Sequence, residues 1–359
     1  MAEPLKNIFS QELVESVAKQ TLKEHPAFKS ELFVQRVVTV EWECLELKQR
    51  MRQVSVSLGE FLPKNYLQSI KILKRVSNQF SGLEHMLFPD FVEIYGMEYL
   101  EESLEALEHF TLNSSSEFAI RPFILKFPEK TMKRIKDWSQ SHNEHVRRLA
   151  SEGCRPRLPW ATALPGFKQD PKPVLNIIEN LIEDESLYVR RSVANNFNDI
   201  SKDNPEIVIR YAKKWVGRSS KATWVMKHAC RGLLKKGEPE VLALFGFANT
   251  EHLKIRDFDL AERVKLGDRL HFNFTIMTHS KRLGKLRLEF LIDFVKANGK
   301  RSSKIFKISE GDYSENSRRV NKYFSFKPIS TRKYYTGIHK LSIIINGKNF
   351  ATGEFVLSD

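Results

Sequence analysis

The chain has 359 residues, of which 41% are hydrophobic and 28% are charged. This is the composition of a folded protein with room for more than one core, and it excludes a chain that is disordered as a whole. Residues 1–10 lack the apolar core of a signal peptide, and no apolar run approaches the roughly 20 residues that cross a bilayer. We therefore expect a cytoplasmic protein with no membrane partner.

Positive charge is concentrated in two parts of the chain. The net charge is +14 overall, −6 over residues 1–120, +12 over residues 121–236, −2 over residues 237–250 and +10 over residues 251–359. A positive field on this scale is the expected footprint of a polyphosphate partner. The distribution favours nucleic acid, with attraction to a membrane surface or simple solubility as alternatives.

Residues 10–247 are predicted to be all-α. Apolar residues recur at three- and four-residue spacings in five segments, residues 11–22, 67–77, 99–110, 174–184 and 206–216. Three of the predicted helices share a valine followed by a pair of residues that includes a basic one, and Val146, Val189 and Val225 stand 43 and 36 residues apart. This period is close to the roughly 40 to 47 residues of HEAT repeats, whose helix pairs stack into a solenoid.

From about Arg263 the apolar period changes to two. Short alternating segments broken by Gly, Asn and Ser cover residues 269–279, 285–295, 303–310, 322–330, 337–347 and 349–359. This pattern is typical of an antiparallel β-sandwich. We therefore predict a HEAT-like domain over residues 1–250 and a β-sandwich domain over residues 260–359, with residues 248–260 as the connection.

The sequence contains no familiar nucleotide or metal motif. GxxxxGK[ST], GxGxxG after a strand and HExxH are all absent. Cys44, Cys154 and Cys230 are too widely spaced for a zinc knuckle or a disulfide framework. His142 and His145 have a helix-compatible spacing but no further ligands nearby, so we expect surface or structural histidines. Neither a metal nor a cofactor is expected.

One short stretch, His142 to Trp160, is unusually rich in arginine. "HNEHVRRLASEGCRPRLPW" contains four arginines and only two acidic residues. A solvated helix would intersperse the two signs of charge. The stretch therefore indicates a site that holds an anion, with these arginines as candidate ligands: Arg147, Arg148, Arg155 and Arg157.

Two carboxylates in the basic segment are candidates for chemistry. Glu117 follows Ser114 by three residues, so it is either the acidic member of a capping box or a carboxylate facing the groove of the solenoid, with Arg121 one turn later. Asp199 closes a predicted repeat helix, while Asp203 or Asn204 before Pro205 is the better cap for the next helix. Asp199 is thus the freer carboxylate.

Three segments resemble the hallmark sequences of a known enzyme family. "SSEFAIRPFI", "HVRRLASEGCRPRLPW" and "VRRSVANNFNDISKDNP" are similar to those of the AlkC branch of the bacterial alkylbase DNA glycosylases, relatives of the AlkD group. The likeness covers essentially the whole chain, including the immunoglobulin-like domain that some AlkC members carry. It implies hydrolysis of the N-glycosidic bond of cationic methylated bases, such as 3-methyladenine and 3-methylcytosine, in duplex DNA. It also implies that the base is not inserted into a deep pocket, unlike in most base-flipping enzymes.

The resemblance also assigns roles to residues. Glu117 and Asp199 match carboxylates of the family motif, which would stabilise the developing oxocarbenium ion and orient the attacking water. Trp160 would pack against the sugar or the cationic base, with a core position behind Pro159 as the alternative. The arginines would hold phosphates that flank the lesion. This group comprises Arg121, Arg147, Arg148, Arg155, Arg157, Arg190 and Arg191.

A second class of function stays open. A non-catalytic HEAT scaffold could bind nucleic acid or acidic proteins through its concave surface. Such a scaffold gains nothing from carboxylates in its groove, because they repel phosphate. Within the enzyme class we expect a monofunctional glycosylase, since no lysine isolated in a carboxylate-flanked pocket can be recognised in the sequence. We also expect the protein to act as a monomer.

Overall fold

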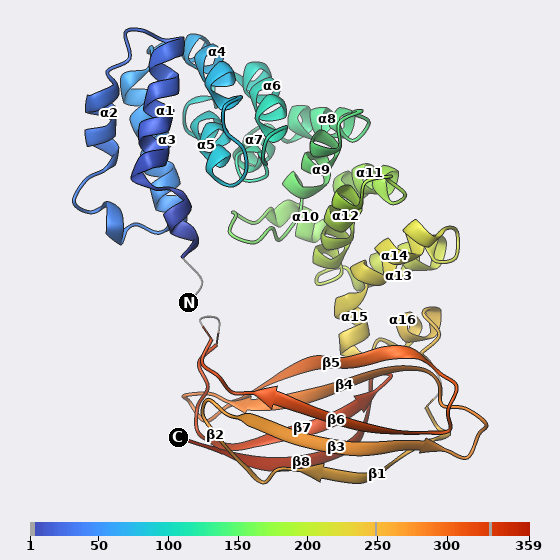
Figure 1. Cartoon of the computed structure of the whole chain (residues 1–359). Helices are drawn as coiled ribbons and strands as arrows, with labels where there is room; N and C mark the ends of the chain where they lie inside the picture. Colours follow the sequence, from blue (N-terminus) through green and yellow to red (C-terminus); the bar gives the residue numbers. More distant parts are fainter. Residues whose placement is uncertain (1–3, 248–249, 330–331) are drawn as a thin grey trace. The chain divides into compact units, whose positions relative to one another are not determined.

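The structure is a computed structural model that describes residues 4–247, 250–329 and 332–359 (Figure 1). The chain divides into two compact units. The first comprises Met1–Val208 and Gly217–Ala229, and the second comprises Ile209–Val216 and Cys230–Asp359. Within the described ranges, no helix combines the length and the apolar character that a membrane span requires.

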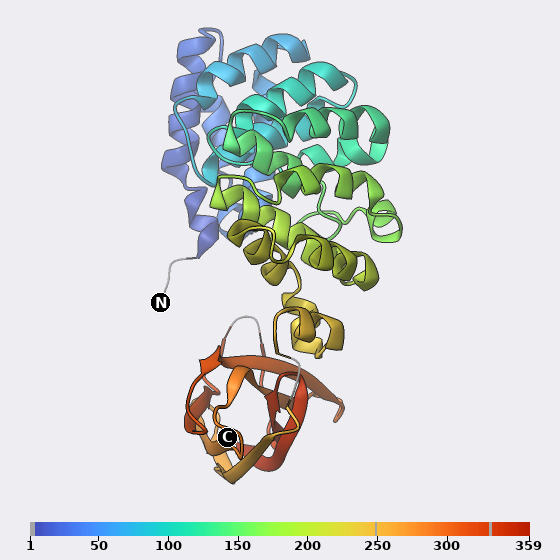
Figure 2. The ribbon, with the colours of Figure 1, turned by 90° about the vertical axis from the view of Figure 1, so that its right-hand side faces the viewer.

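The first unit is built from stacked helices, as the spacing of apolar residues predicted. The helices follow one another in successive layers in chain order (Figures 1 and 2). Their bounds are α1 (Gln11–Glu24), α2 (Ser30–Val37), α3 (Leu47–Phe61), α4 (Tyr66–Ser77), α5 (Leu87–Tyr95), α6 (Leu100–Thr111), α7 (Ile120–Lys126), α8 (Pro128–Trp138), α9 (Glu144–Gly153), α10 (Pro165–Gln169), α11 (Lys172–Ile178), α12 (Leu187–Ile200) and α14 (Ser220–Ala229). Short 3₁₀ turns lie at Leu5–Ile8, Trp42–Cys44, Glu84–Met86 and Glu179–Leu181.

The helix starts follow from local chemistry. Ser10, Asn65 and Asn143 each precede a helix and accept a hydrogen bond from a backbone N–H of its first turn. Proline opens α8, and it opens α13 (Pro205–Trp215), which passes from the first unit to the second. These signals were readable in the sequence.

The three repeat valines occupy equivalent buried positions. Val146, Val189 and Val225 lie on α9, α12 and α14 and are at most 2% exposed. Helix α12 packs against both α9 and α14. Each valine therefore contributes to the seam between neighbouring repeats, which agrees with the HEAT-like reading of their spacing.

The second unit holds two β-sheets around one core. Its strands are β1 (Leu253–Leu260), β2 (Arg263–Lys265), β3 (Arg269–Thr278), β4 (Gly284–Val295), β5 (Arg301–Tyr313), β6 (Ser317–Ser325), β7 (Gly337–Ile345) and β8 (Lys348–Ser358). One sheet has the order β1-β3-β6 and the other β2-β8-β7-β4-β5. All described pairs are antiparallel except β2 with β8. Helices α15 (Arg231–Lys236) and α16 (Pro239–Leu244) precede the strands.

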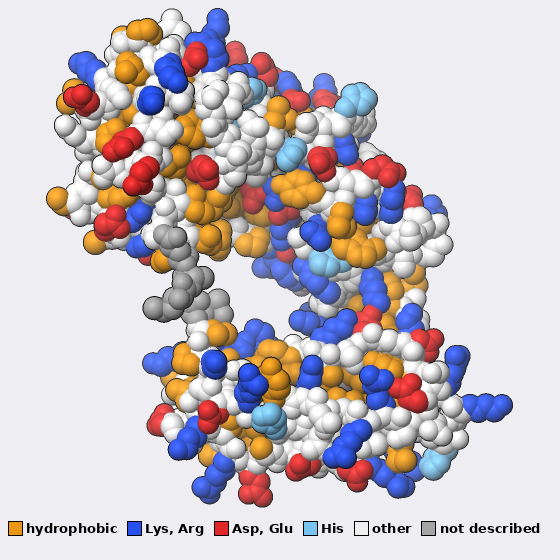
Figure 3. Space-filling model, viewed as in Figure 1, with side chains coloured by type: hydrophobic (Ala, Val, Ile, Leu, Met, Phe, Trp, Pro, Cys, Tyr) orange, Lys and Arg blue, Asp and Glu red, His pale blue; other side chains and the backbone are white. Residues whose placement is uncertain are grey.

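Alternation of side chains builds the core of this sandwich. Leu270, Phe272, Phe274 and Ile276 of β3 are buried, while the residues between them are more exposed. Figure 3 shows lysine and arginine side chains spread over the face that carries β3 and β6. The β-sandwich prediction is confirmed.

Two expected boundaries are wrong. The segment predicted as a connection contains β1, which pairs with β3 from Leu253 onward. Its alternation was hidden because the register shifts between Arg256 and Asp259, where Asp257 has a φ of 52°. The strand expected over residues 322–330 is β6, which instead spans Ser317–Ser325. Residues 248, 249 and 330 of these predicted segments lie outside the described residues.

Candidate active site

Arg121 of α7 anchors the loop that follows α9. Its guanidinium donates to the carbonyl oxygens of Gly153 at 3.0 Å, Arg155 at 2.9 Å and Thr162 at 2.6 Å. Arg121 is 1% exposed, and burial lowers its pKa to about 10. The expectation that Arg121 contacts a phosphate is therefore wrong, because the structure buries this guanidinium under the loop.

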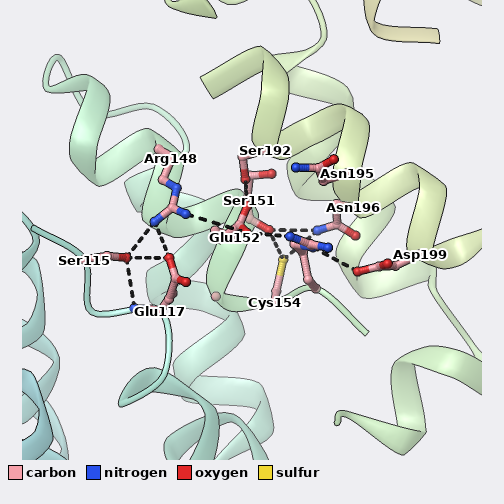
Figure 4. Close-up of polar contacts among 12 residues, drawn as sticks. Ser115, Glu117, Arg148, Ser151, Glu152, Cys154, Ser192, Asn195, Asn196 and Asp199 are labelled. Atoms are coloured by element: carbon pink, nitrogen blue, oxygen red, sulfur yellow. Dashed lines mark hydrogen bonds and ion pairs between the residues drawn. The ribbon is translucent and has the colours of Figure 1, made fainter. Parts of the chain in front are cut away.

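A chain of alternating charges crosses the joint between α9 and α12 (Figure 4). Arg148 pairs with Glu117 and lies 3.6 Å from Glu152. Glu152 accepts from Arg155 at 2.6 Å, and Arg155 donates to Asp199 at 2.9 Å. Each carboxylate thus faces a guanidinium in a region largely shielded from water, and such pairing offsets the cost of burying both charges.

Glu117 is held in place by its own loop. Ser115 Oγ donates to Glu117 Oε2 at 2.8 Å and accepts from Arg148 at 2.6 Å. Helix α7 begins at Ile120 and its cap makes no side-chain hydrogen bond, so the capping-box alternative for Glu117 is wrong. The carboxylate is instead oriented by two side chains, with 14% of it exposed.

A cavity of about 250 Å³ lies beside this carboxylate. Its wall is mainly apolar and includes Phe9, Met51, Met86, Phe118 and Leu158. The charged lining consists of Glu117, Glu152, Arg155 and Lys48. An apolar cavity with a few convergent charged groups is the usual form of a small-molecule or base site.

Trp160 stands at this cavity and is not a core residue. It lines the cavity, yet it is 64% exposed. Its backbone φ is 62°, a left-handed conformation that costs a residue with a side chain about 1 to 2 kcal/mol. Strain of this kind, at the edge of a cavity, is a feature of functional sites.

Asp199 lies one layer further back than Glu117. It is 1% exposed and is absent from the described lining of the cavity. Arg155 and Lys202 donate to its two oxygens at 2.9 and 3.0 Å. The structure thus brings Glu117 and Trp160 to one cavity and connects Asp199 to it through Arg155.

Most of the other predicted phosphate ligands have protein partners. Arg147 donates to both oxygens of Asp184 at 2.6 and 3.0 Å, and Arg190 donates to the carbonyls of Asp184 and Glu185. Arg157 pairs with Asp203 at the surface, its side chain 37% exposed. Arg191 is exposed. These contacts leave Arg157 and Arg191 the most accessible of the predicted arginines.

Two residues of the cavity were missed as functional candidates. Glu152 is 6% exposed and accepts from Ser192 at 2.6 Å as well as from Arg155. Its spacing of four residues from Arg148 and three from Arg155 was a readable signal for ion pairing. Lys48 comes from α3, far away in sequence, so no local pattern could place it. Among the described residues, no cluster of His, Cys, Asp or Glu could hold a metal ion.

Comparisons with known proteins agree with this architecture. Residues 92–233 match the family model described as DNA alkylation repair enzyme, and residues 254–359 match that of the C-terminal Ig-like domain of the uncharacterised protein YhaZ. YhaZ of Bacillus subtilis (strain 168) is 48% identical over 346 residues, 96% of each chain. The structure of Pseudomonas fluorescens alkylpurine DNA glycosylase AlkC, bound to DNA containing an abasic site analog, is similar with a TM-score of 0.95 and 34% identity, covering 99% of this chain and 100% of that one.

Proposed function

We propose a specific reaction for this chain, which belongs to the AlkC-type alkylbase DNA glycosylases with a C-terminal immunoglobulin-like domain. It hydrolyses the N-glycosidic bond of cationic methylated bases, such as 3-methyladenine and 3-methylcytosine, in duplex DNA. The observation that carries the proposal is the oriented carboxylate of Glu117 in a cavity that Trp160 also lines.

The chemistry needs negative charge more than it needs a proton donor. A base alkylated on a ring nitrogen is already positively charged, so it is a good leaving group without protonation. As the bond breaks, positive charge moves onto the sugar, and a fixed carboxylate nearby stabilises it. Glu117 supplies this charge and positions the attacking water, because Ser115 and Arg148 fix its orientation.

Asp199 acts through a neighbour in this scheme. Its carboxylate orients Arg155, and Arg155 in turn holds Glu152 against the cavity. Neutralising Asp199 removes one of the two carboxylate partners of a buried guanidinium and so disturbs Glu152 at the cavity. Trp160 offers its indole face to the cationic base or to the sugar. Arg157 and Arg191 bind the phosphates that flank the lesion, and the enzyme works as a monomer without a cofactor.

The test is direct. Purified protein is incubated with methylated duplex DNA, and the bases released are identified by mass spectrometry, with unmethylated DNA as the control. We expect free 3-methyladenine and 3-methylcytosine, together with abasic sites that break only on alkali treatment. Tight DNA binding without release of any base would favour the non-catalytic scaffold instead, and strand breaks without alkali would contradict the monofunctional reaction.

A further inference from the structure

The loop that carries Trp160 needs an external support. Trp160 adopts a left-handed backbone conformation that residues with a side chain rarely occupy. Such conformations persist only where surrounding contacts hold them. Within the loop, Ala161 N donates to Leu158 O at the long distance of 3.4 Å. A second internal bond, Leu164 N to Pro156 O at 3.2 Å, and the contacts of Arg121 hold the loop on either side of Trp160 but not at Trp160 itself.

Lys48 supplies a stronger restraint from another layer of the solenoid. Its Nζ donates to the backbone oxygen of Trp160 at 2.9 Å, across 112 residues of sequence. The same ammonium lies 4.6 Å from the centroid of the Phe118 ring, next in sequence to Glu117. Lys48, Phe118 and Trp160 all line the cavity. One side chain thus connects α3, the Glu117 loop and the Trp160 loop.

We propose that Lys48 is a positioning residue that holds the indole of Trp160 at the mouth of the cavity. The inference rests on the proposed function and adds the residue that orders the aromatic side of the cavity. A cation in a site for cationic bases would repel the substrate if it were free. Here its charge is committed to a carbonyl oxygen and an aromatic face. The ammonium therefore fixes the Trp160 loop and leaves the indole face available.

Lys48→Met removes the ammonium and keeps the length of the stem. Single-turnover release of methylated bases should fall roughly ten- to a hundredfold, the loss expected when a group at the reacting centre is misplaced by about 1 Å. The affinity for DNA should change by less than about threefold, as for the loss of one exposed charge. Lys19→Met on α1 removes an exposed lysine with the same loss of charge, and should release bases at the wild-type rate.

A second readout does not depend on activity. The full-length protein is labelled with 5-fluorotryptophan, and the Trp160 resonance is assigned with Trp160→Phe. Lys48→Met should shift or broaden this resonance and leave the signals of Trp138 and Trp224 unchanged. Lys48→Arg, which retains a cationic donor, should return the resonance and the rate part of the way to wild type. An unchanged Trp160 resonance in Lys48→Met would overturn the proposal.

A double-mutant cycle tests whether Lys48 acts through Trp160. In a Trp160→Ala background, Lys48→Met should cause no further loss of base release. Full additivity of the two losses would overturn the positioning role, since Lys48 would then act on DNA directly. A wild-type protein that releases no base would refute the proposed reaction, whereas the fluorine spectra would still decide whether Lys48 holds Trp160.

Discussion

Glu117 and Asp199 are both paired with arginine, but only Glu117 lines the cavity. Glu117→Gln should therefore lower base release by about a hundredfold or more, the usual effect of removing one oriented charge-stabilising group, with DNA affinity retained or slightly improved. Asp199→Asn should lose most base release as well, because Arg155 is left partly unpaired. Single-turnover kinetics and DNA-binding titrations of both variants check this.

The two variants should differ in stability. Asp199 is 1% exposed and its loss leaves a buried guanidinium with one partner fewer, so the free energy of unfolding should fall by about 2 kcal/mol. Glu117→Gln also takes one partner from Arg148, but this pair is 13% and 14% exposed, so the loss should be smaller, about 1 kcal/mol. Wild-type rates of base release in both variants would contradict the catalytic assignment.

The buried carboxyl of Asp90 should make the free energy of unfolding depend on pH. Burial raises the pKa of this carboxyl, which is 3% exposed, to about 6 although Arg52 lies 2.9 Å away. The folded state then binds the proton more tightly than the unfolded state, so this group favours folding at low pH and the contribution is lost as pH rises from about 4 to about 6. Asp90→Asn should flatten that part of the stability curve by about 2 kcal/mol. Urea unfolding at pH 4.5 and 7 measures it, and an unchanged slope would refute it.

At the level of single residues, the resemblance named candidate side chains, and only the structure shows where they lie. Glu117 and Trp160 line one cavity. The burial of Arg121 could not be predicted, because arginine is nearly always exposed unless it is paired, and its partners are loop carbonyls up to 41 residues away. Lys48 could not be identified from the sequence either, because its contacts depend on how the repeats stack.

At the level of elements, α7 supports the site through its single buried arginine. Arg121→Leu would leave the carbonyls of Gly153, Arg155 and Thr162 without their donor. Each buried polar group left unsatisfied costs about 1 to 3 kcal/mol, so we expect a loss of about 3 kcal/mol in the free energy of unfolding. Chemical denaturation measures the loss.

Lys126→Met on the same helix is the matched control. Lys126 is 45% exposed and pairs with Glu98, which is 81% exposed, so its loss should cost less than about 1 kcal/mol. Equal destabilisation by the two substitutions would show that α7 tolerates no change of charge, and that the loop contacts of Arg121 have no special weight.

Element boundaries were predictable where a local signal existed. Ser10, Asn65 and Asn143 cap their helices as their residue types suggest. The start of α7 was not, because the spacing of Ser114 and Glu117 suggested a capping box, whereas the helix begins at Ile120 and has no side-chain cap. Strand β1 was missed since an irregularity in pairing interrupts its alternation. In both places the tertiary structure overrides the local pattern.

At the level of the whole molecule, the question is how the cations of the two basic segments are paired. In the helical unit, most arginines of the segment with charge +12 are paired with carboxylates or carbonyl oxygens of the protein itself. In the β-rich unit several cations are exposed and make no ion pair in the part of the chain that the structure describes. These are Lys281, Arg282, Arg319 and Lys322. The β-rich segment therefore has exposed charge available for a polyanion.

If these four cations contact DNA phosphates, changing them to glutamine in the full-length protein should weaken binding to methylated and unmethylated duplexes alike. Each lost phosphate contact lowers the slope of log affinity against log salt by about 0.9, so the slope should become shallower by between one and four such steps. The rate of base release at saturating DNA should not change, because the substitutions lie far in sequence from Glu117 and Trp160.

The matched control changes four exposed lysines of the acidic N-terminal segment, Lys19, Lys29, Lys64 and Lys71, to glutamine. An equal change in slope for both sets would mean that affinity follows net charge alone, and an unchanged slope for the first set would leave the β-sandwich without a role in DNA binding.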